Sequence, residues 1–242
     1  VRLLVTSKAY RQSSIASPEL LQLDPSNQLV ARQARFRLPA EMIRDNALAV
    51  SGLLVKKVGG ASVKPYQPSG YYRHMNFPTR KYKHDTNSDQ WRRGLYVHWQ
   101  RMFLHPMMKA MDAPSREECT ARRPQSNTPN AALVLLNDPT FLEAARVLAD
   151  KILNDGGESF DSRIEFAYRT VLHRTPDTLE REVLARLLQQ TLDGYQNAPK
   201  SAQDLIGQGI AKVTNPDDPI ELAGWTSVAR ALLNLSETVT RN

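Results

Sequence analysis

The chain is poor in cysteine, since Cys119 is the only one among its 242 residues. A single cysteine excludes an internal disulfide, a CxxCH haem-attachment site and a cysteine-rich zinc site within this chain. Long hydrophobic runs are missing too, because no stretch approaches the ~18 apolar residues of a membrane span. Residues 2–14 have no signal-peptide pattern and are expected to be the remnant of a helix. This start predicts that the chain is a C-terminal fragment of a longer protein.

Signatures of catalysis and of metal binding are absent as well. The sequence contains no GxSxG elbow, no glycine-rich phosphate loop and no HExxH motif. None of the five histidines has a carboxylate at helical spacing that would complete a metal-binding face. Cys119 lies near Arg116, Arg122 and Arg123, which favour a thiolate, but two neighbouring glutamates oppose them. We therefore expect a buried, unreactive cysteine, and no metal ion or cofactor in this chain.

Acidic residues are scarce in the first half of the chain. Residues 1–125 hold 21 Lys/Arg and 9 Asp/Glu, a net charge of +12, whereas residues 126–242 hold 11 and 16, a net charge of −5. A basic half can meet an anionic glycan, an acidic protein or nucleic acid. It can also meet the acidic half of its own chain, which is the interpretation that we favour.

Nucleic acid is the least expected of these partners. Arg73, Arg80, Lys81 and Lys83 do lie among tyrosines, a mixture that is typical of single-strand binding. The sequence has, however, no helix-turn-helix with a basic recognition helix and no aromatic RNA-binding motif.

The sequence is rich in capping residues and in apolar residues at helical spacing. A threonine or aspartate followed by proline is a typical helix start, and it predicts four helices. They are expected at 128–136, at 138–154, at 175–195 and from 218 onward. Further helices are expected at 27–33, 38–54, 159–172 and 199–211 from their caps and apolar spacing. Residues 56–90 are expected to form a long Pro/Tyr-rich loop, either functional or a variable insertion. Residues 93–103 could be a strand or a buried helix, and we favour a short extended segment or hairpin. The predicted fold is mainly α, a multi-helix bundle-like single domain over 1–242 with one short β element.

The strongest group of polar residues lies between the two halves. A further helix is expected to start at Pro114, with Asp112 or Ser115 as its N-terminal cap. One interpretation is that these side chains only cap and pair neighbouring helices. The other is that they line a cleft for a polar or anionic ligand, in which arginines act as forks for carboxylate, sulfate or phosphate. The candidate ligand-binding residues are Asp112, Arg116, Glu117, Arg123, Asn127, Asn137 and Asp138.

Several long phrases of the chain resemble a known family. They are LVTSKAYRQSS, NQLVARQARFRLPAEMIRDNALAVSGLL, GGASVKPYQP, RRGLYVHWQR, DAPSREECTARRPQSNTPNAALVLLNDPTFLEAARVLA and WTSVARALLNLSETVTR. Together these phrases are similar to the planctomycete-specific domain of unknown function at the C-terminus of large proteins that also carry a cytochrome-c-like domain. The resemblance covers nearly the whole chain.

The resemblance implies a setting in the periplasm or cell envelope, with haem c bound by an upstream domain that is absent here. It implies no reaction and supplies no catalytic residues. The expected function is therefore a non-catalytic binding or scaffold module, whose partners are the upstream domains, an anionic glycan or another protein. The alternative is a part of a redox or glycan-processing enzyme with its polar site in 112–138.

Overall fold

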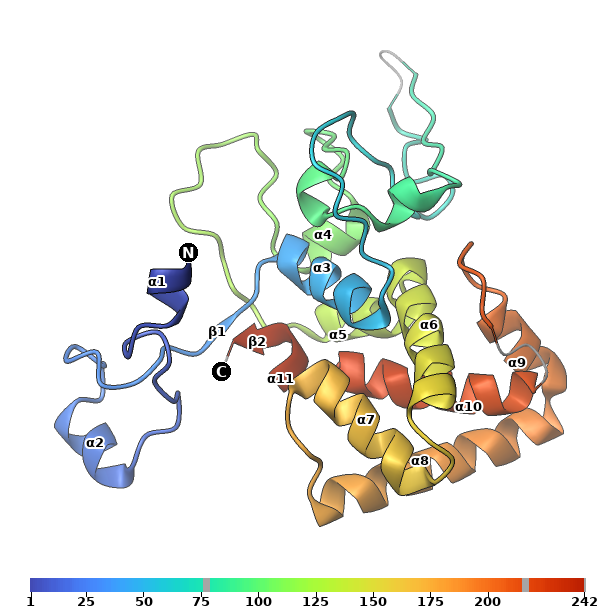
Figure 1. Ribbon diagram of the computed structural model, residues 1–242. Helices are drawn as coiled ribbons and strands as arrows, with labels where there is room; N and C mark the ends of the chain where they lie inside the picture. Colours follow the sequence, from blue (N-terminus) through green and yellow to red (C-terminus); the bar gives the residue numbers. More distant parts are fainter. Residues whose placement is uncertain (76–78, 215–217, 242) are drawn as a thin grey trace.

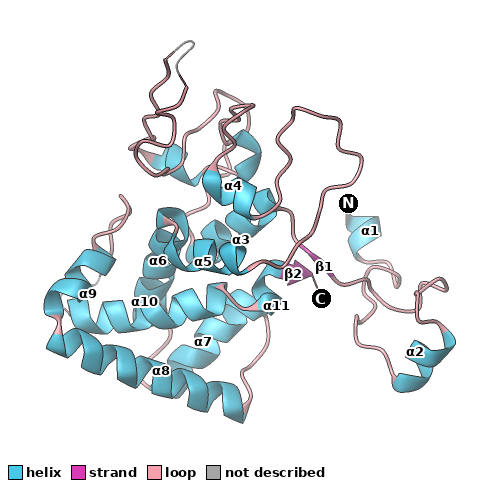
Figure 2. Cartoon of the chain, turned by 180° about the vertical axis from the view of Figure 1, so that it is seen from behind, coloured by secondary structure: helices cyan, strands magenta, loops and turns pink. Residues whose placement is uncertain are grey.

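The computed structural model describes residues 1–75, 79–214 and 218–241, and this part of the chain is mainly α-helical (Figures 1 and 2). The first half contains α1 (Arg2–Val5), α2 (Pro18–Leu23), β1 (Phe36–Arg37), α3 (Ala40–Ser51), two 3-10 helices (Ser88–Trp91 and Gly94–Tyr96) and α4 (Pro106–Ala110). The second half contains α5 (Pro129–Asn137), α6 (Pro139–Asp155), α7 (Phe160–Leu172), α8 (Thr178–Asn197), α9 (Pro199–Ile206), α10 (Pro219–Leu233), α11 (Ser236–Val239) and β2 (Thr240–Arg241). The predicted mainly α fold is confirmed.

Short polar side chains define where the helices of the second half begin. The hydroxyl of Thr128 accepts a hydrogen bond from the backbone N–H of Ala131 at the start of α5, 3.3 Å away. Asp138 accepts from the N–H of Thr140 and so begins α6. At α8, Asp177 and Glu180 form a reciprocal capping box. These caps satisfy backbone donors that the helix itself leaves free, which explains why the Ser/Thr/Asp signals located these helices correctly.

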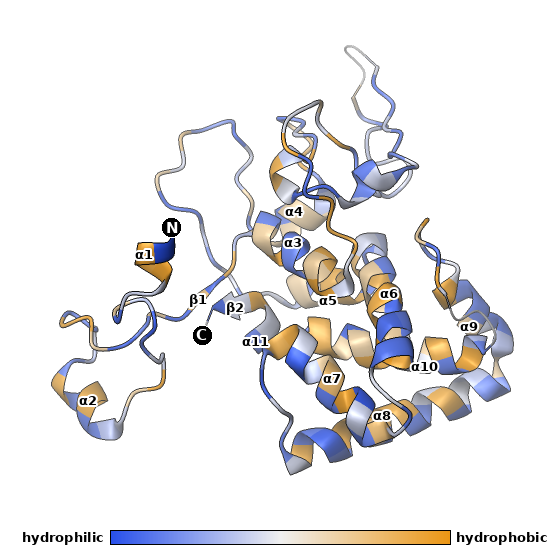
Figure 3. Ribbon diagram, in the orientation of Figure 1, coloured by the Kyte–Doolittle hydropathy of each residue, from blue (hydrophilic) through white to orange (hydrophobic). Residues whose placement is uncertain are grey.

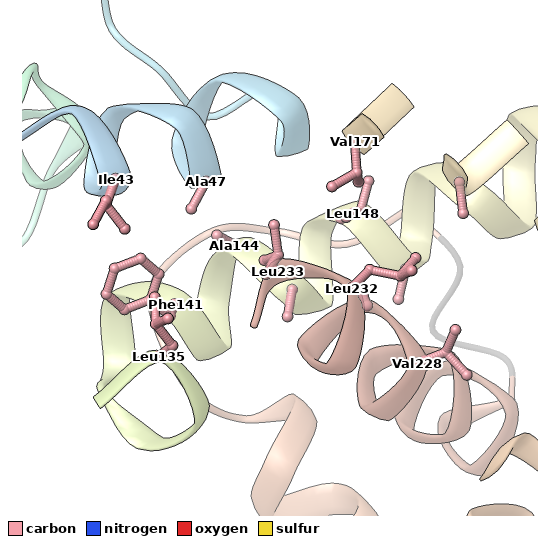
Figure 4. Close-up of a cluster of buried hydrophobic side chains, with 14 of the residues drawn as sticks. Ile43, Ala47, Leu135, Phe141, Ala144, Leu148, Val171, Val228, Leu232 and Leu233 are labelled. Carbon is pink, nitrogen blue, oxygen red and sulfur yellow. The ribbon is translucent and has the colours of Figure 1, made fainter. Parts of the chain in front are cut away.

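The core lies where α10 crosses α6, with α3 on one side and α7 and α8 on the other (Figures 1 and 4). Leu148 of α6 and Val228 of α10 are fully buried in it. Ile43 and Ala47 of α3 point toward the same cluster from the basic half (Figure 4). One hydrophobic cluster therefore contains residues of both halves of the sequence. That residues 1–242 form a single domain stays a prediction.

The short β element is not at 93–103, where the sequence predicted it. β1 and β2 pair antiparallel, with Phe36 opposite Arg241 and Arg37 opposite Thr240. The 93–103 segment instead begins with a 3-10 turn and makes an isolated bridge between Val97 and Val63. A strand of two residues carries too little periodicity to be recognised in a sequence.

Three expectations for local structure were wrong. Residues 27–33 form turns, because the carboxylate of Asp24 accepts from the N–H groups of Gln28 and Leu29, and Asn27 has a left-handed φ of 52°. Residues 114–123 are an exposed loop rather than a helix, with Arg116 at a φ of 64°. The predicted 2–14 helix is short, since α1 ends at Val5.

Residues 1–33 form an arm that stands away from the helical body (Figure 1). Among them only Asp24 is buried, and apolar side chains such as Leu3 and Leu23 are exposed. The helices of this arm, α1 and α2, include hydrophobic stretches, coloured orange (Figure 3). None of the described helices is long and apolar enough to cross a membrane.

The ion pairs do not join the basic half to the acidic half. Between residues of 1–75, 79–214 and 218–241, each pair has both partners in the same half, as in Arg123–Glu41 and Arg163–Glu221. The halves meet through the apolar core instead. The two halves of the chain thus meet, as we expected, but among the described residues they do so through apolar packing rather than through ion pairs.

Candidate ligand-binding site

A hollow of about 520 Å³ lies where the long loop meets the helices of the second half. Small ligands typically occupy clefts of ~300–1,000 Å³ that are mostly apolar with a few converging polar groups. The residues that line it are Tyr66, Gln67, Pro68, His84, Pro106, Met107, Leu133, Val134, Asn137, Asp138, Pro139, Gln208 and Gly209. We call this the Gln67 hollow.

The side-chain amide of Gln67 is buried without a partner. Both its Nε2 and its Oε1 are shielded from solvent, and neither makes a hydrogen bond within the described residues. Leaving a buried donor or acceptor unpaired costs about 1–3 kcal/mol. Since solvent does not reach these two atoms, a ligand in the hollow can use this donor and acceptor only when the Gln67 side chain turns outward.

Asp138 supplies a carboxylate at the junction of α5 and α6. It caps α6 by accepting from the backbone N–H of Thr140 at 2.9 Å. Burial raises the pKa of Asp138 to about 6, although the bonds from Thr140 and the positive charge of Arg44 act in the opposite direction. The carboxyl group therefore changes its charge in a pH range where an ordinary aspartate is already ionised.

The backbone beside the hollow is held by His105. Its Nε2–H donates to the carbonyl oxygen of Tyr66, 2.7 Å away, and the ring is 2 % exposed. Burial lowers the pKa of His105 to about 4, so the ring is neutral at pH 7. This bond fixes the backbone next to Gln67 and so positions its amide.

Glu143 of α6 holds the segment that closes another side. One of its carboxylate oxygens accepts from the N–H groups of Ile210 at 2.6 Å and Ala211 at 2.7 Å, and the other from the Trp91 ring at 3.0 Å. Glu143 is fully buried, and its three donors compensate for the loss of water. Gly209 contacts this carboxylate so closely that an added Cβ would overlap it, which explains the glycine in the wall.

A second hollow, of about 450 Å³, adjoins the first. Gln67, Pro68 and His84 line both hollows. The second is distinguished by three cations, Arg73, Arg80 and Lys81, which we call the basic wall. None of its lining residues is acidic.

Comparison with known proteins places the chain in a family. Residues 1–188 match PSD1, a protein of unknown function (DUF1553). The chain belongs to the PSD1 family. No curated protein and no solved structure matches it. The match includes the loop that carries Gln67 and the basic wall, and it ends within α8.

In this PSD1 chain the predicted site residues do not meet in one place. Asn137 and Asp138 line the Gln67 hollow. Asn127 lines a separate hollow of about 300 Å³ near the C-terminal segment, together with Arg37 and Ser126.

The carboxylate of Asp112 is held by two neighbouring residues, Arg37 and Ser126. It pairs with Arg37 at 2.7 Å and accepts from the backbone N–H of Ser126, also at 2.7 Å. Burial acts to raise the pKa of Asp112, but the hydrogen bonds from Ser126 and the charge of Arg37 lower it on balance. Asp112 thus ties the 112–126 loop to β1 through Arg37. The interpretation that these side chains pair neighbouring elements fits Asp112, although its partners lie in a strand and a loop rather than in helices.

The remaining predicted residues are spread along the same loop. The guanidinium of Arg116 lies 4.1 Å from the centre of the Trp99 ring, Glu117 pairs weakly with Arg101 at 3.5 Å, and Arg123 pairs with Glu41 at 2.8 Å. They contact neighbours individually and do not converge on a cleft.

Cys119 is exposed, so the expectation of a buried cysteine was wrong. The reason is that residues 114–123, which were expected to pack as a helix, form an exposed loop.

Sequence reasoning missed Gln67 and missed Tyr66, whose carbonyl oxygen accepts from His105. The available signal was the density of tyrosine and proline in 56–90, which located the long loop but did not single out a residue. Within the described ranges, no three His, Cys, Asp or Glu side chains gather where a metal ion could bind.

Proposed function

We propose that this PSD1 domain is a non-catalytic binding module that holds a polar ligand, or the polar end of a larger one, in the Gln67 hollow. The observation that carries the proposal is the unpartnered amide of Gln67, which a turn of its side chain would present to a cleft of ligand size. A folded protein keeps such a group at a cost in stability, and a ligand that pairs with it recovers that cost. The ionisable carboxyl group of Asp138 adds a second polar contact in the same cleft.

We further propose that the module belongs to a multidomain protein of the periplasm or cell envelope, with haem c in an upstream cytochrome-c-like domain. The support for this setting is the sequence resemblance alone. The upstream domains are then partners within the same polypeptide, and the chain itself carries no cofactor.

The test is a binding screen with the 242-residue chain. Neutral sugars, acidic glycans, metal ions and a small c-type cytochrome are added, and the melting temperature and the heat of binding are measured. A ligand of the Gln67 hollow binds the unaltered chain and binds Gln67→Leu at least tenfold more weakly, the effect of losing about two hydrogen bonds. Gln22→Leu, at an exposed position on α2, is the matched control and leaves binding unchanged. Equal binding by both variants contradicts a site at Gln67.

A second candidate is that the domain completes a redox or glycan-processing enzyme. The observation that favours it is the Asp138 pKa of about 6 in a cleft that His84 also lines. Groups with a pKa near neutrality are suited to general acid–base catalysis. Turnover of an oligosaccharide that Asp138→Asn abolishes while binding persists supports the enzyme, and binding without turnover at any pH from 4 to 9 supports the module.

A further inference from the structure

We infer that the ligand is an acidic oligosaccharide, with one neutral sugar ring in the Gln67 hollow and a sulfate or carboxylate group of the neighbouring unit on the basic wall. This inference rests on the proposed function and names the ligand class for the same site. It is carried by two adjoining hollows that share Gln67, Pro68 and His84 as lining residues, of which only the second is lined by three cations.

The Gln67 hollow suits a sugar ring. Hydroxyl groups both donate and accept, and the Gln67 amide offers the complementary acceptor and donor once its side chain turns outward into the hollow. The ionised carboxylate of Asp138 accepts further hydroxyl hydrogen bonds, which are stronger because the acceptor is charged. Pro68, Pro106 and Pro139 supply apolar walls against which the C–H face of a ring can pack.

The basic wall suits the anionic group. Arg73, Arg80 and Lys81 form no ion pair with any residue in the described ranges, and no acidic side chain lines their hollow. The Nη1 of Arg80 donates to Gln100 Oε1 at 3.2 Å, which leaves other guanidinium donors free for a planar or tetrahedral anion. Cations without a carboxylate in reach attract an anion from solution at little desolvation cost to the protein.

The tyrosines beside the wall argue for a saccharide rather than a nucleic acid. Single-strand binders need aromatic faces that bases can stack on. Tyr72 is 8 % exposed, and its ring packs edge-on against Tyr82 at 5.3 Å. The hydroxyls of Tyr71 and Tyr82 donate to the carbonyls of Leu104 and Pro65. The rings thus build the loop and are not free to stack on bases.

The experiment compares a sulfated galactose tetrasaccharide with the same molecule after desulfation, by titration calorimetry on the 242-residue chain. The sulfated form is expected to bind about tenfold more tightly, which two charge-assisted contacts readily supply. The double variant Arg80→Ala/Lys81→Ala loses this preference, keeps the affinity for the desulfated form and keeps the melting temperature. Lys56→Ala/Lys57→Ala removes the same charge from exposed positions at the start of the loop, which do not line either hollow, and retains the preference. A galacturonate tetrasaccharide separates carboxylate from sulfate recognition.

Each other outcome overturns the inference. If the desulfated sugar binds as well as the sulfated one, the basic wall is not a subsite, and the proposed function stands. If both double variants lose the preference equally, the effect is one of overall charge. If an oligothymidylate of matched length binds as tightly as the sulfated sugar, the wall recognises nucleic acid. If neither sugar binds, a response to another ligand class in the binding screen preserves the proposed function, and no response contradicts both.

Discussion

Replacing Gln67 is expected to stabilise the folded chain and to weaken ligand binding. Its amide is buried and unpartnered, so replacing it by an apolar side chain of similar size removes an unsatisfied group. We expect Gln67→Leu to raise the free energy of unfolding by about 1 kcal/mol, measured by urea denaturation. Gln22→Leu, on the exposed face of α2, serves as control and should leave the free energy of unfolding unchanged. A loss of stability in Gln67→Leu would mean that the amide is satisfied in the free protein.

Asp138 is expected to make stability depend on pH. Its pKa is about 6 in the folded chain, against ~3.9 in an unfolded one. Between these values the folded state binds more protons, so the free energy of unfolding falls as pH rises, by about 3 kcal/mol in all. Asp138→Asn keeps a good helix cap and removes this fall.

His105 acts in the opposite direction over nearly the same range. Its folded pKa of about 4 lies below the ~6.5 of an unfolded histidine, so its contribution raises the free energy of unfolding as pH rises. The two slopes partly cancel in the unaltered protein. The difference between the chain and Asp138→Asn, measured by denaturation from pH 4 to 7, therefore isolates Asp138. A difference that does not vary with pH contradicts the raised pKa.

At the scale of elements, the contact between α10 and α8 depends on Gly224. A Cβ there would lie 2.8 Å from Leu192 Cδ2 and 3.2 Å from Leu188 Cδ1. We expect Gly224→Ala to lower the free energy of unfolding by about 1–3 kcal/mol, because overpacking outweighs the better helix propensity of alanine. Gly194→Ala in α8 is the matched control, since nothing lies within 4 Å of its added Cβ. That variant should gain up to ~1 kcal/mol. Equal effects of the two substitutions would contradict close packing at Gly224.

At the scale of the whole molecule, the two ends of the chain differ in how much core they hold. Residues 1–33 bury only Asp24, whereas α10 buries Trp225, Leu222 and Leu232. Removing 1–33 should leave the free energy of unfolding within about 1 kcal/mol. Removing 189–242 should abolish the cooperative transition, because α6 loses the helix that it packs on. The measurements are urea denaturation and near-ultraviolet circular dichroism. A cooperative transition in the 1–188 fragment would mean that the family-matched part folds alone.

The sequence was sufficient for the candidate site only in part. Asn137 and Asp138 could be singled out because a cap before proline is a local signal, and they do line the Gln67 hollow. Asp112, Arg116 and Arg123 were grouped with them because they are near in sequence. The structure separates them. The 112–126 loop contacts β1 and α3, whereas Asp138 lines a hollow together with residues of the long loop. Proximity along an irregular segment does not fix proximity in space.

The sequence by itself determined the helix starts and their apolar faces, because caps and 3.6-residue periodicity act within a few neighbouring residues. It also determined that residues 56–90 would form no long α-helix, because prolines and paired glycines interrupt any helix. Only the tertiary structure decided that α10 crosses α6, that Glu143 holds the 210–211 backbone and that the Gln67 amide is buried without a partner. These facts join residues tens of positions apart, and they follow from which apolar faces pack together rather than from any local pattern.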